Sequence, residues 1–387
     1  MKRILTVLIA LLPLINFAQD VQFFQGTWEE VNAKAKAENK LIFVDAYTYW
    51  CGPCKMMDET MFHNNKEVAD YINAHFIAYK VECEHDFGVE FARKYKVNVY
   101  PTMLMFNSSG QLLEKHLGYN DVQSEFIETF RKVVNMDQTD VYAMDPAKIK
   151  MNWPEFYAKN FKDANDPTWK RDKSVDPNIW LDQQTDLFNE VSWAVMYIFN
   201  TNEKYSKFFL DNYETYKAKY KFEAQDEINN IIYGFMNTAV KENKPELMTS
   251  AESLMQKYFP EDTSGLFYLR LNYMMSVGDN NGLANLMSNY IATNKEVYLG
   301  TVNAAAWNLY ENCDDQKILQ TAISWFQPYL PTITDYFAMD TYAALLYKTK
   351  QYASAEEWAI KAIALGKADG EDMAGTEELL EKIKKEK

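Results

Sequence analysis

The sequence predicts an α/β domain with a mixed sheet and flanking helices, followed by an all-α domain of helical repeats. The chain has 387 residues, which is long enough for two domains. In its first third, short apolar runs of strand length alternate with amphipathic helical patterns. From about Thr185 onward, apolar residues recur at the three- and four-residue spacing of helices.

The composition excludes some classes of function. The net charge of −15 argues against binding to nucleic acids or to anionic membrane surfaces, because both need basic patches. Charged residues make up 25% of the chain, close to the average for globular proteins. We therefore expect a folded protein without a nucleic-acid partner.

The first 18 residues have the pattern of a secretory signal peptide. Lys2 and Arg3 give a basic start, an apolar run follows from Ile4 to Ile15, and Ala18 is a small residue at a plausible cleavage position. The run is shorter than the roughly 20 apolar residues that span a bilayer. We predict export to the periplasm, cleavage after residue 18 and no membrane span in the mature chain; an uncleaved anchor is the alternative.

Residues 19–136 are predicted to form the α/β domain. Thr27 and Glu30 have the spacing of a capping box at the start of a helix that runs to Asn39. The continuous apolar run from Leu41 to Val44 predicts a buried central strand. The remaining elements are expected to be a helix from Cys51 to about His63, helices at 66–74 and 87–95, strands at 76–81, 102–106 and 111–117, and a helix capped by Asp121 and ending near Asn135. This order predicts parallel strands early and an antiparallel hairpin late.

The rest of the chain is predicted to be a linker at residues 137–183 and a helical domain at residues 184–387. In the linker, Asp, Asn and Pro cluster and the periodicity fades, apart from one short helix at 154–161. In the helical domain, turns near Asn243, Gly278, Cys313 and Lys350 are separated by 35, 35 and 37 residues.

This spacing, with Ala343, Ala355 and Ala362 where helices would cross, resembles the tetratricopeptide repeat, whose period is about 34 residues. A helical bundle without repeats is the alternative. By analogy with such repeats, we expect the helical domain to bind a protein partner.

The cysteines indicate redox chemistry. The chain has only four, and two of them form the sequence Cys51-Gly52-Pro53-Cys54. A zinc site would need a second pair of ligands, but Cys83 and Cys313 are single and the four histidines show no ligand spacing. We therefore expect neither a metal nor another cofactor, and a disulfide between Cys51 and Cys54 as the reactive group.

The spacing of the two cysteines has a physical reason. At the start of a helix, free backbone amides and the helix dipole stabilise the Cys51 thiolate and lower its pKa. Pro53 suits the first helical turn, where its missing N–H has no cost. Cys54 lies one turn later on the same face, within reach of a disulfide. We expect Cys51 to be the exposed nucleophile and Cys54 to resolve the mixed disulfide.

Residues 22–135 resemble the thioredoxin superfamily, both in the segment from Val44 to Lys55 and in the motifs that follow. The resemblance implies that Asp45, six residues before Cys51, is a buried acid that accepts a proton as Cys54 attacks. An exposed Asp at a strand end is the alternative. Lys80 matches the lysine that accompanies this acid, although a plain surface lysine fits the sequence nearly as well.

The resemblance also implies a substrate surface. Tyr100-Pro101-Thr102 matches the family's cis-proline loop, and Gly118 matches a glycine that lets the substrate approach. Tyr100 stands where many thioredoxins have a small aliphatic residue, so substrate choice is expected to differ. The residues expected to form this surface are Trp50, Gly52, Pro53, Tyr100, Pro101 and Gly118.

The resemblance is strongest to exported relatives that receive electrons from a membrane reductant. It implies a thiol–disulfide oxidoreductase whose partners are protein thiols and disulfides and a membrane-bound or soluble electron-donor thiol protein. The Gly52-Pro53 dipeptide is that of strongly reducing thioredoxins, which favours disulfide reduction. A disulfide isomerase or chaperone, and a helical adaptor with a thioredoxin-like docking module, are the alternatives. Cys83 and Cys313 are expected to be structural, with Cys83 half-buried.

Overall fold

The computed structural model describes residues 20–199, 201–294 and 296–387. The predicted signal peptide lies outside the described residues. The chain divides into two compact units, one ending at Glu227 and one from Ile228 to Lys387. In the part of the chain that the structure describes, we find no helix with the length and apolar character needed to cross a membrane.

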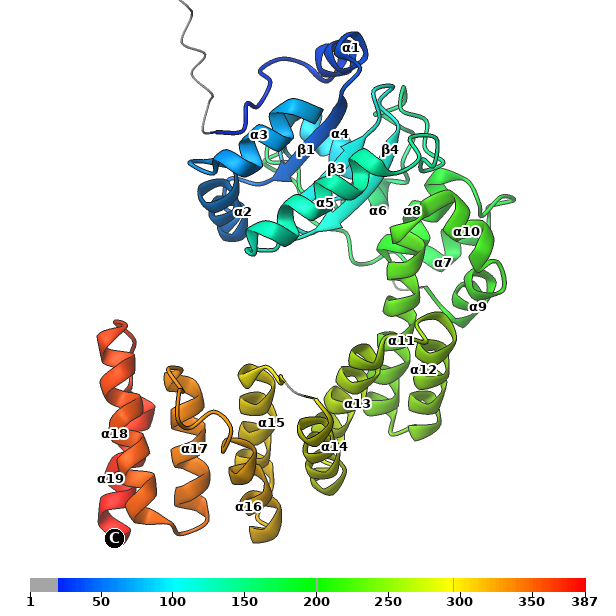
Figure 1. Cartoon of the computed structure of the whole chain (residues 1–387). Coiled ribbons are helices and arrows are strands. Elements are labelled where there is room, and N and C mark those ends of the chain that lie inside the picture. Colours follow the sequence, from blue (N-terminus) through cyan, green and yellow to red (C-terminus); the bar gives the residue numbers. More distant parts are fainter. Residues whose placement is uncertain (1–19, 200, 295) are drawn as a thin grey trace, which may run out of the picture. The chain divides into compact units, whose positions relative to one another are not determined.

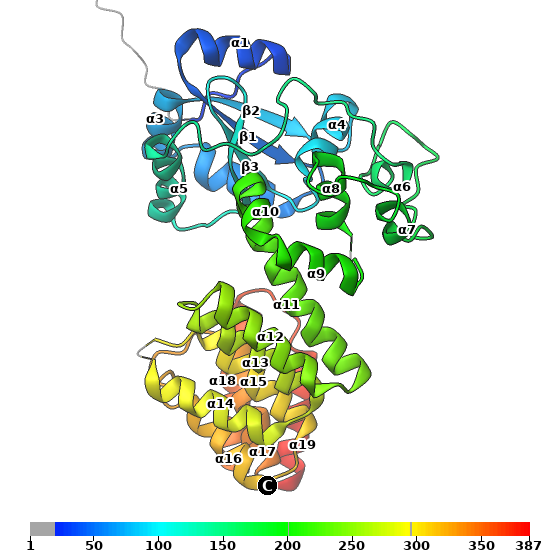
Figure 2. The ribbon, with the colours of Figure 1, turned by 90° about the vertical axis from the view of Figure 1, so that its right-hand side faces the viewer.

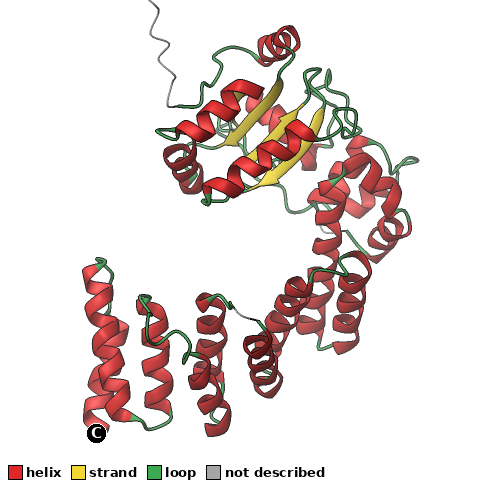
Figure 3. Ribbon diagram, in the orientation of Figure 1, coloured by secondary structure: helices red, strands yellow, loops and turns green. Residues whose placement is uncertain are grey.

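The first unit contains a mixed four-stranded sheet in the order β2-β1-β3-β4 (Figure 3). Strands β1 and β2 are parallel, whereas β3 is antiparallel to both β1 and β4. The strands are β1 (Leu41–Tyr47), β2 (Phe76–Glu82), β3 (Thr102–Phe106) and β4 (Leu112–Leu117). The predicted mixed sheet, with its early parallel pair and late antiparallel hairpin, is confirmed.

Helices cover both faces of this sheet (Figures 1 and 2). Helices α3 and α5 pack side by side on one face, where Phe43 of β1 contacts Phe62 and Phe130. Helix α4 lies on the other face, where Trp28 of α1 contacts Phe91. The helices are α1 (Trp28–Glu38), α2 (Gly52–Met57), the π-helical turn η1 (Asp58–Phe62), α3 (Lys66–His75), α4 (Asp86–Tyr95) and α5 (Gln123–Asn135).

The helix starts agree with the sequence in one case and differ in another. The capping box of Thr27 and Glu30 is present at the start of α1. Asp121, in contrast, does not cap α5: the N-cap is Val122, whose N–H is bound by the side chain of Asn120. The prediction for Asp121 was wrong because the helix begins one residue later, with Val122 as its N-cap, and no side-chain hydrogen bond caps it.

Residues 137–183, predicted to be a linker, are irregular in backbone but carry buried side chains. Tyr142 and Tyr157 are both fully buried, and the Tyr157 hydroxyl donates to the Arg93 carbonyl at the end of α4. Lys162 pairs with the buried Glu84 at 2.7 Å. The further helices of this unit are α6 (Glu155–Ala158), α7 (Pro177–Leu181), α8 (Glu190–Ile198), α9 (Glu203–Asp211), α10 (Tyr213–Tyr220) and the first residues of α11 (Phe222–Glu242).

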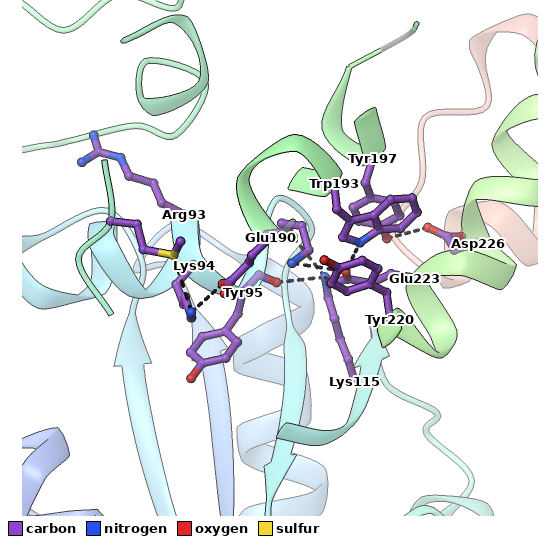
Figure 4. Close-up of polar contacts among 12 residues, drawn as sticks. Arg93, Lys94, Tyr95, Lys115, Glu190, Trp193, Tyr197, Tyr220, Glu223 and Asp226 are labelled. Atoms are coloured by element: carbon purple, nitrogen blue, oxygen red, sulfur yellow. Dashed lines mark hydrogen bonds and ion pairs between the residues drawn. The ribbon is translucent and has the colours of Figure 1, made fainter. Parts of the chain in front are cut away.

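A buried charge cluster joins these helices to the edge strand β4 (Figure 4). The Lys115 ammonium donates to the carbonyls of Tyr95 and Lys96 and lies 3.2 Å from Glu223 of α11. The ammonium of Lys96 is also 3.2 Å from Glu223, and the Trp193 indole donates to the same carboxylate. Lys96, Lys115 and Glu223 are completely buried, so each of these charges depends on the others for compensation.

All the regular secondary structure in the described part of the second unit is helical (Figure 3). Its helices beyond α11 are α12 (Pro245–Tyr258), α13 (Thr263–Val277), α14 (Asn280–Thr293), α15 (Leu299–Asn312), α16 (Gln316–Trp325), α17 (Tyr336–Lys348), α18 (Tyr352–Ala368) and α19 (Ala374–Glu386). The four predicted turns fall between consecutive helices. Ala343, Ala355 and Ala362 are fully buried, and α17 packs against α18.

Candidate active site

The two cysteines lie where strand β1 leads into helix α2. Cys51 is the N-cap of α2, with Pro53 in the first turn. Its Sγ accepts a hydrogen bond from the backbone N–H of Cys54 at 3.1 Å. Cys51 and Cys54 form the disulfide that the sequence predicts. The free amides of the helix start therefore face the Cys51 sulfur, as a stabilised thiolate requires.

The exposure of the disulfide differs from the prediction. Cys51 is only 3% exposed, so the expectation of an exposed sulfur was wrong for this oxidised state. The reason is that its Sγ turns toward the helix to bond with Cys54. Trp50 next to it is 63% exposed, and Gly52 and Pro53 are also exposed. A partner therefore meets the Trp50 ring and the Gly52-Pro53 backbone first.

The predicted proline loop lies beside this surface. The bond between Tyr100 and Pro101 is cis, and the Tyr100 ring packs edge-on against Trp50 at 5.9 Å between ring centroids. The backbone N–H of Gly118 donates to the Pro101 carbonyl at 2.7 Å, with Gly118 at a φ of 72°. Such a positive φ favours glycine. The structure thus brings Trp50, Tyr100, Pro101 and Gly118 together.

Asp45 is buried in the middle of the sheet, at 1% exposure. Its register partner on β2 is Lys80, whose ammonium lies 3.7 Å from Asp45 Oδ2. The pKa of Asp45 is raised to about 7, mainly by burial; Lys80 opposes this shift and the nearby Asp58 carboxylate adds to it. An acid with such a pKa exchanges protons readily near neutral pH. The buried position expected for Asp45 is therefore present.

Comparison with known proteins identifies the N-terminal region. The thioredoxin family profile matches residues 22–132. Thioredoxin-1 of Saccharomyces cerevisiae is 37% identical over 86 residues, which cover 22% of this chain and 76% of that protein. The chain belongs to the thioredoxin family.

The chain is also similar to a second thioredoxin and to a solved structure. The mitochondrial Thioredoxin-3 of Saccharomyces cerevisiae is 33% identical over 88 residues, covering 23% of this chain and 63% of that protein, so the chain spans less than two thirds of its length. The solution structure of a candidate disulphide-isomerase from Bacteroides thetaiotaomicron has 38% sequence identity and a TM-score of 0.29, and covers 31% of this chain and 98% of that one. The family match places the similarity to thioredoxins in residues 22–132, the thioredoxin domain.

In this thioredoxin domain, one charged residue at the site was missed by the sequence reasoning. Asp58 lies four residues after Cys54, in the π-helical turn, and its carboxylate accepts a hydrogen bond from the Lys80 ammonium. Its backbone N–H bonds to the Cys54 carbonyl, which fixes it relative to the resolving cysteine. The only sequence signal is a carboxylate one helical turn after Cys54.

The other two cysteines are buried thiols. Cys83 follows β2 and is 1% exposed, so it is more buried than predicted. Burial raises its pKa well above the usual range, and the carboxylates of Glu82 and Asp45 add to this. Cys313 is buried in the helical core of the second unit. Among the described residues, no group of His, Cys, Asp and Glu side chains has the arrangement of a metal site.

Proposed function

We propose that this chain is an exported thiol–disulfide oxidoreductase that reduces disulfides in other proteins. One observation carries the proposal: the Cys51–Cys54 disulfide caps helix α2 beside the cis Tyr100–Pro101 bond and the exposed Trp50. This arrangement supplies a stabilised thiolate and a surface for an extended substrate segment. The match to thioredoxins over residues 22–132 supports the same chemistry.

The reaction starts from the reduced protein. The Cys51 thiolate attacks one sulfur of a substrate disulfide, and the other substrate sulfur leaves as a thiolate. The thiol of Cys54 then loses its proton to Asp45 and attacks the Cys51 sulfur, which releases the second substrate thiol. Two electrons pass from the cysteine pair to the substrate, so a donor thiol protein has to reduce the Cys51–Cys54 disulfide again.

Insulin reduction by the full chain tests the proposal. The reduced wild-type protein, kept reduced by dithiothreitol, is expected to accelerate insulin precipitation, whereas Cys51→Ala is expected to be inactive. The variant Cys313→Ala is a matched control, because it removes a thiol far along the chain from the pair. A wild-type protein as slow as Cys51→Ala would leave the adaptor function as the better explanation.

Export to the periplasm is a further part of the proposal, and it is supported by the pattern of residues 1–18. In a bacterial host, N-terminal sequencing of the protein from the periplasmic fraction is expected to begin at Gln19. A chain that keeps Met1 and stays with the cytoplasmic fraction would contradict export.

For the helical region we propose a partner-binding role and a tetratricopeptide-like arrangement. A cavity of about 310 Å³ lies between α15, α17 and α19, with Trp307, Tyr310 and Phe337 in its wall. Phe337 is 60% exposed, so its ring is accessible to a partner. We expect Phe337→Ala to reduce the number of different proteins that form mixed disulfides with Cys51. The rate of insulin reduction should stay the same.

Reduction and isomerisation differ in what they require of the assembly. An isomerase of the chaperone type needs a dimer with a shared cleft, whereas a reductase has no such requirement. Light scattering of the full chain distinguishes the two: a monomer supports the reductase, and a stable dimer that refolds scrambled ribonuclease supports the isomerase.

A further inference from the structure

The Lys80 ammonium is held mainly by Asp58, not by Asp45. It donates a hydrogen bond to Asp58 Oδ1 but lies 3.7 Å from the nearer Asp45 oxygen, beyond hydrogen-bonding distance. The rings of Phe23 and Tyr47 lie 4.8 and 5.6 Å from the same ammonium. The hydrogen bond to Asp58 and the contacts with the two aromatic rings together hold the Lys80 ammonium at this distance from Asp45.

This arrangement leaves the Asp45 carboxyl without a hydrogen bond from Lys80. Among the described residues, none makes a hydrogen bond to Asp45 Oδ1, although the side chain is buried. An ionised Asp45 is costly, because one carboxyl oxygen accepts no hydrogen bond and the other has only the 3.7 Å ion pair with Lys80. The carboxyl therefore has a strong tendency to take up a proton.

We propose that Asp58 is a positioning residue for the second half of the reaction: by holding Lys80, it keeps Asp45 ready to accept the proton that Cys54 loses. The inference rests on the proposed thiol–disulfide exchange and adds a residue that sets the proton affinity of Asp45. In the mixed disulfide, the Cys54 S–H proton passes to Asp45 as the Cys54 sulfur bonds to Cys51. The bond from Cys51 to the substrate sulfur breaks, and the substrate leaves with that electron pair.

The charged groups around Asp45 differ in their exposure to solvent. Asp45 is 1% exposed, whereas the side chains of Lys80 and Asp58 are 28% and 31% exposed. His63 faces Asp58 at 3.9 Å and Asp20 at 3.3 Å, both at the surface. The other titratable groups that act on or near Asp45 are Tyr47 and Cys83. The buried acid thus has partly exposed charged side chains in its surroundings.

Removing the Asp58 charge changes Asp45 in a direction that can be worked out. In Asp58→Asn, Lys80 loses its charged partner, and Asp45 becomes the remaining carboxylate within its reach. The repulsion between the two carboxylates also disappears. Both changes favour the ionised form of Asp45.

The titration of Asp45 in the oxidised full chain tests this directly. With ¹³C-labelled Asp carboxyl groups, the Asp45 signal is identified by its loss in Asp45→Asn and followed against pH. We expect the midpoint to fall by about one pH unit or more in Asp58→Asn, as for a carboxylate that gains a close cationic partner. Asp58→Glu keeps the charge and is expected to stay near the wild type. Asp70→Asn removes an exposed carboxylate paired with Lys66 on α3 and is the matched control.

The outcomes separate this inference from the proposed function. An unchanged Asp45 midpoint in Asp58→Asn, or an equal shift in Asp70→Asn, overturns the role of Asp58. A shift that also moves the acid limb of insulin reduction to lower pH supports it. If the wild type reduces no insulin at any pH while the midpoint still shifts, the proposed function fails and the electrostatic link remains.

Discussion

Replacing Asp45 with Asn is expected to stabilise the protein at alkaline pH while slowing its reaction. Asp45 is buried, lacks a close hydrogen-bonded ion pair, and has a pKa raised from its ordinary 3.8 to about 7. The folded state therefore binds this proton more tightly than the unfolded state does. Asn has nearly the same size, keeps hydrogen-bonding groups and carries no charge.

The sign and size of the effect follow from this pKa difference. The stability that the proton contributes is complete below pH 3.8 and is lost as the pH rises through about 7. The difference of about 3 pH units, at about 1.4 kcal/mol for each, amounts to about 4 kcal/mol. Asp45→Asn avoids this loss, so it is expected to exceed the wild type by up to about 4 kcal/mol at pH 8 and by little at pH 4.

Urea unfolding of the full chain, followed by tryptophan fluorescence at pH 4 to 8, measures the effect. The free energy of unfolding of the wild type should fall across this range relative to that of Asp45→Asn. A constant difference between the two proteins at all pH values would refute the reasoning, because it would show that the carboxyl is not titrating in the site. In parallel, the variant should accumulate the mixed disulfide on Cys51, since Cys54 has lost its proton acceptor.

Two further substitutions test the reaction and the fold. Cys54→Ala should retain substrates as mixed disulfides on Cys51, visible as bands on non-reducing gels that dithiothreitol removes; a lane without such bands would contradict the assigned order of attack. Glu223→Gln leaves Lys96 and Lys115 buried without their shared carboxylate, and should lower the free energy of unfolding by about 3–5 kcal/mol. A loss of less than about 1 kcal/mol in urea unfolding would mean that water reaches the cluster.

The elements of the thioredoxin domain could be predicted because each has a simple periodicity. The apolar run from Leu41 to Val44 indicates β1, but the strand continues to Tyr47. The prediction stopped early because Asp45 is a charged residue, and a carboxylate seldom occupies a buried strand. The resemblance to thioredoxins anticipated its burial beside Lys80, but only the folded structure adds Asp58 as the hydrogen-bonded partner of that lysine.

The site residues that lie in short sequence motifs could be predicted, whereas one that depends on a distant partner could not. Cys51, Cys54 and Pro101 belong to short motifs, and the sequence alone identifies them. Asp58 escaped notice because its partner Lys80 is 22 residues away, on another element. A helix carboxylate looks like a solvated charge until the tertiary fold places a cation next to it.

The buried lysines show the largest gap between sequence and structure, and they affect where the domain can be cut. Lys96 and Lys115 look like surface residues in the sequence, yet both are fully buried under helices that follow residue 136. The Tyr157 hydroxyl and the Lys162 ammonium also bind the domain from this later segment.

A fragment of residues 20–136 therefore exposes the edge strand β4 and the apolar surface around it. A fragment of residues 20–242 retains the helices that cover β4, including the whole of α11. We expect the shorter fragment to unfold at lower urea concentration and to associate in light scattering, because an uncovered edge strand pairs with other chains. The longer fragment should remain dispersed. Equal unfolding midpoints, with both fragments monomeric, would mean that the helices after residue 136 are a separate attachment and not part of the folded thioredoxin unit.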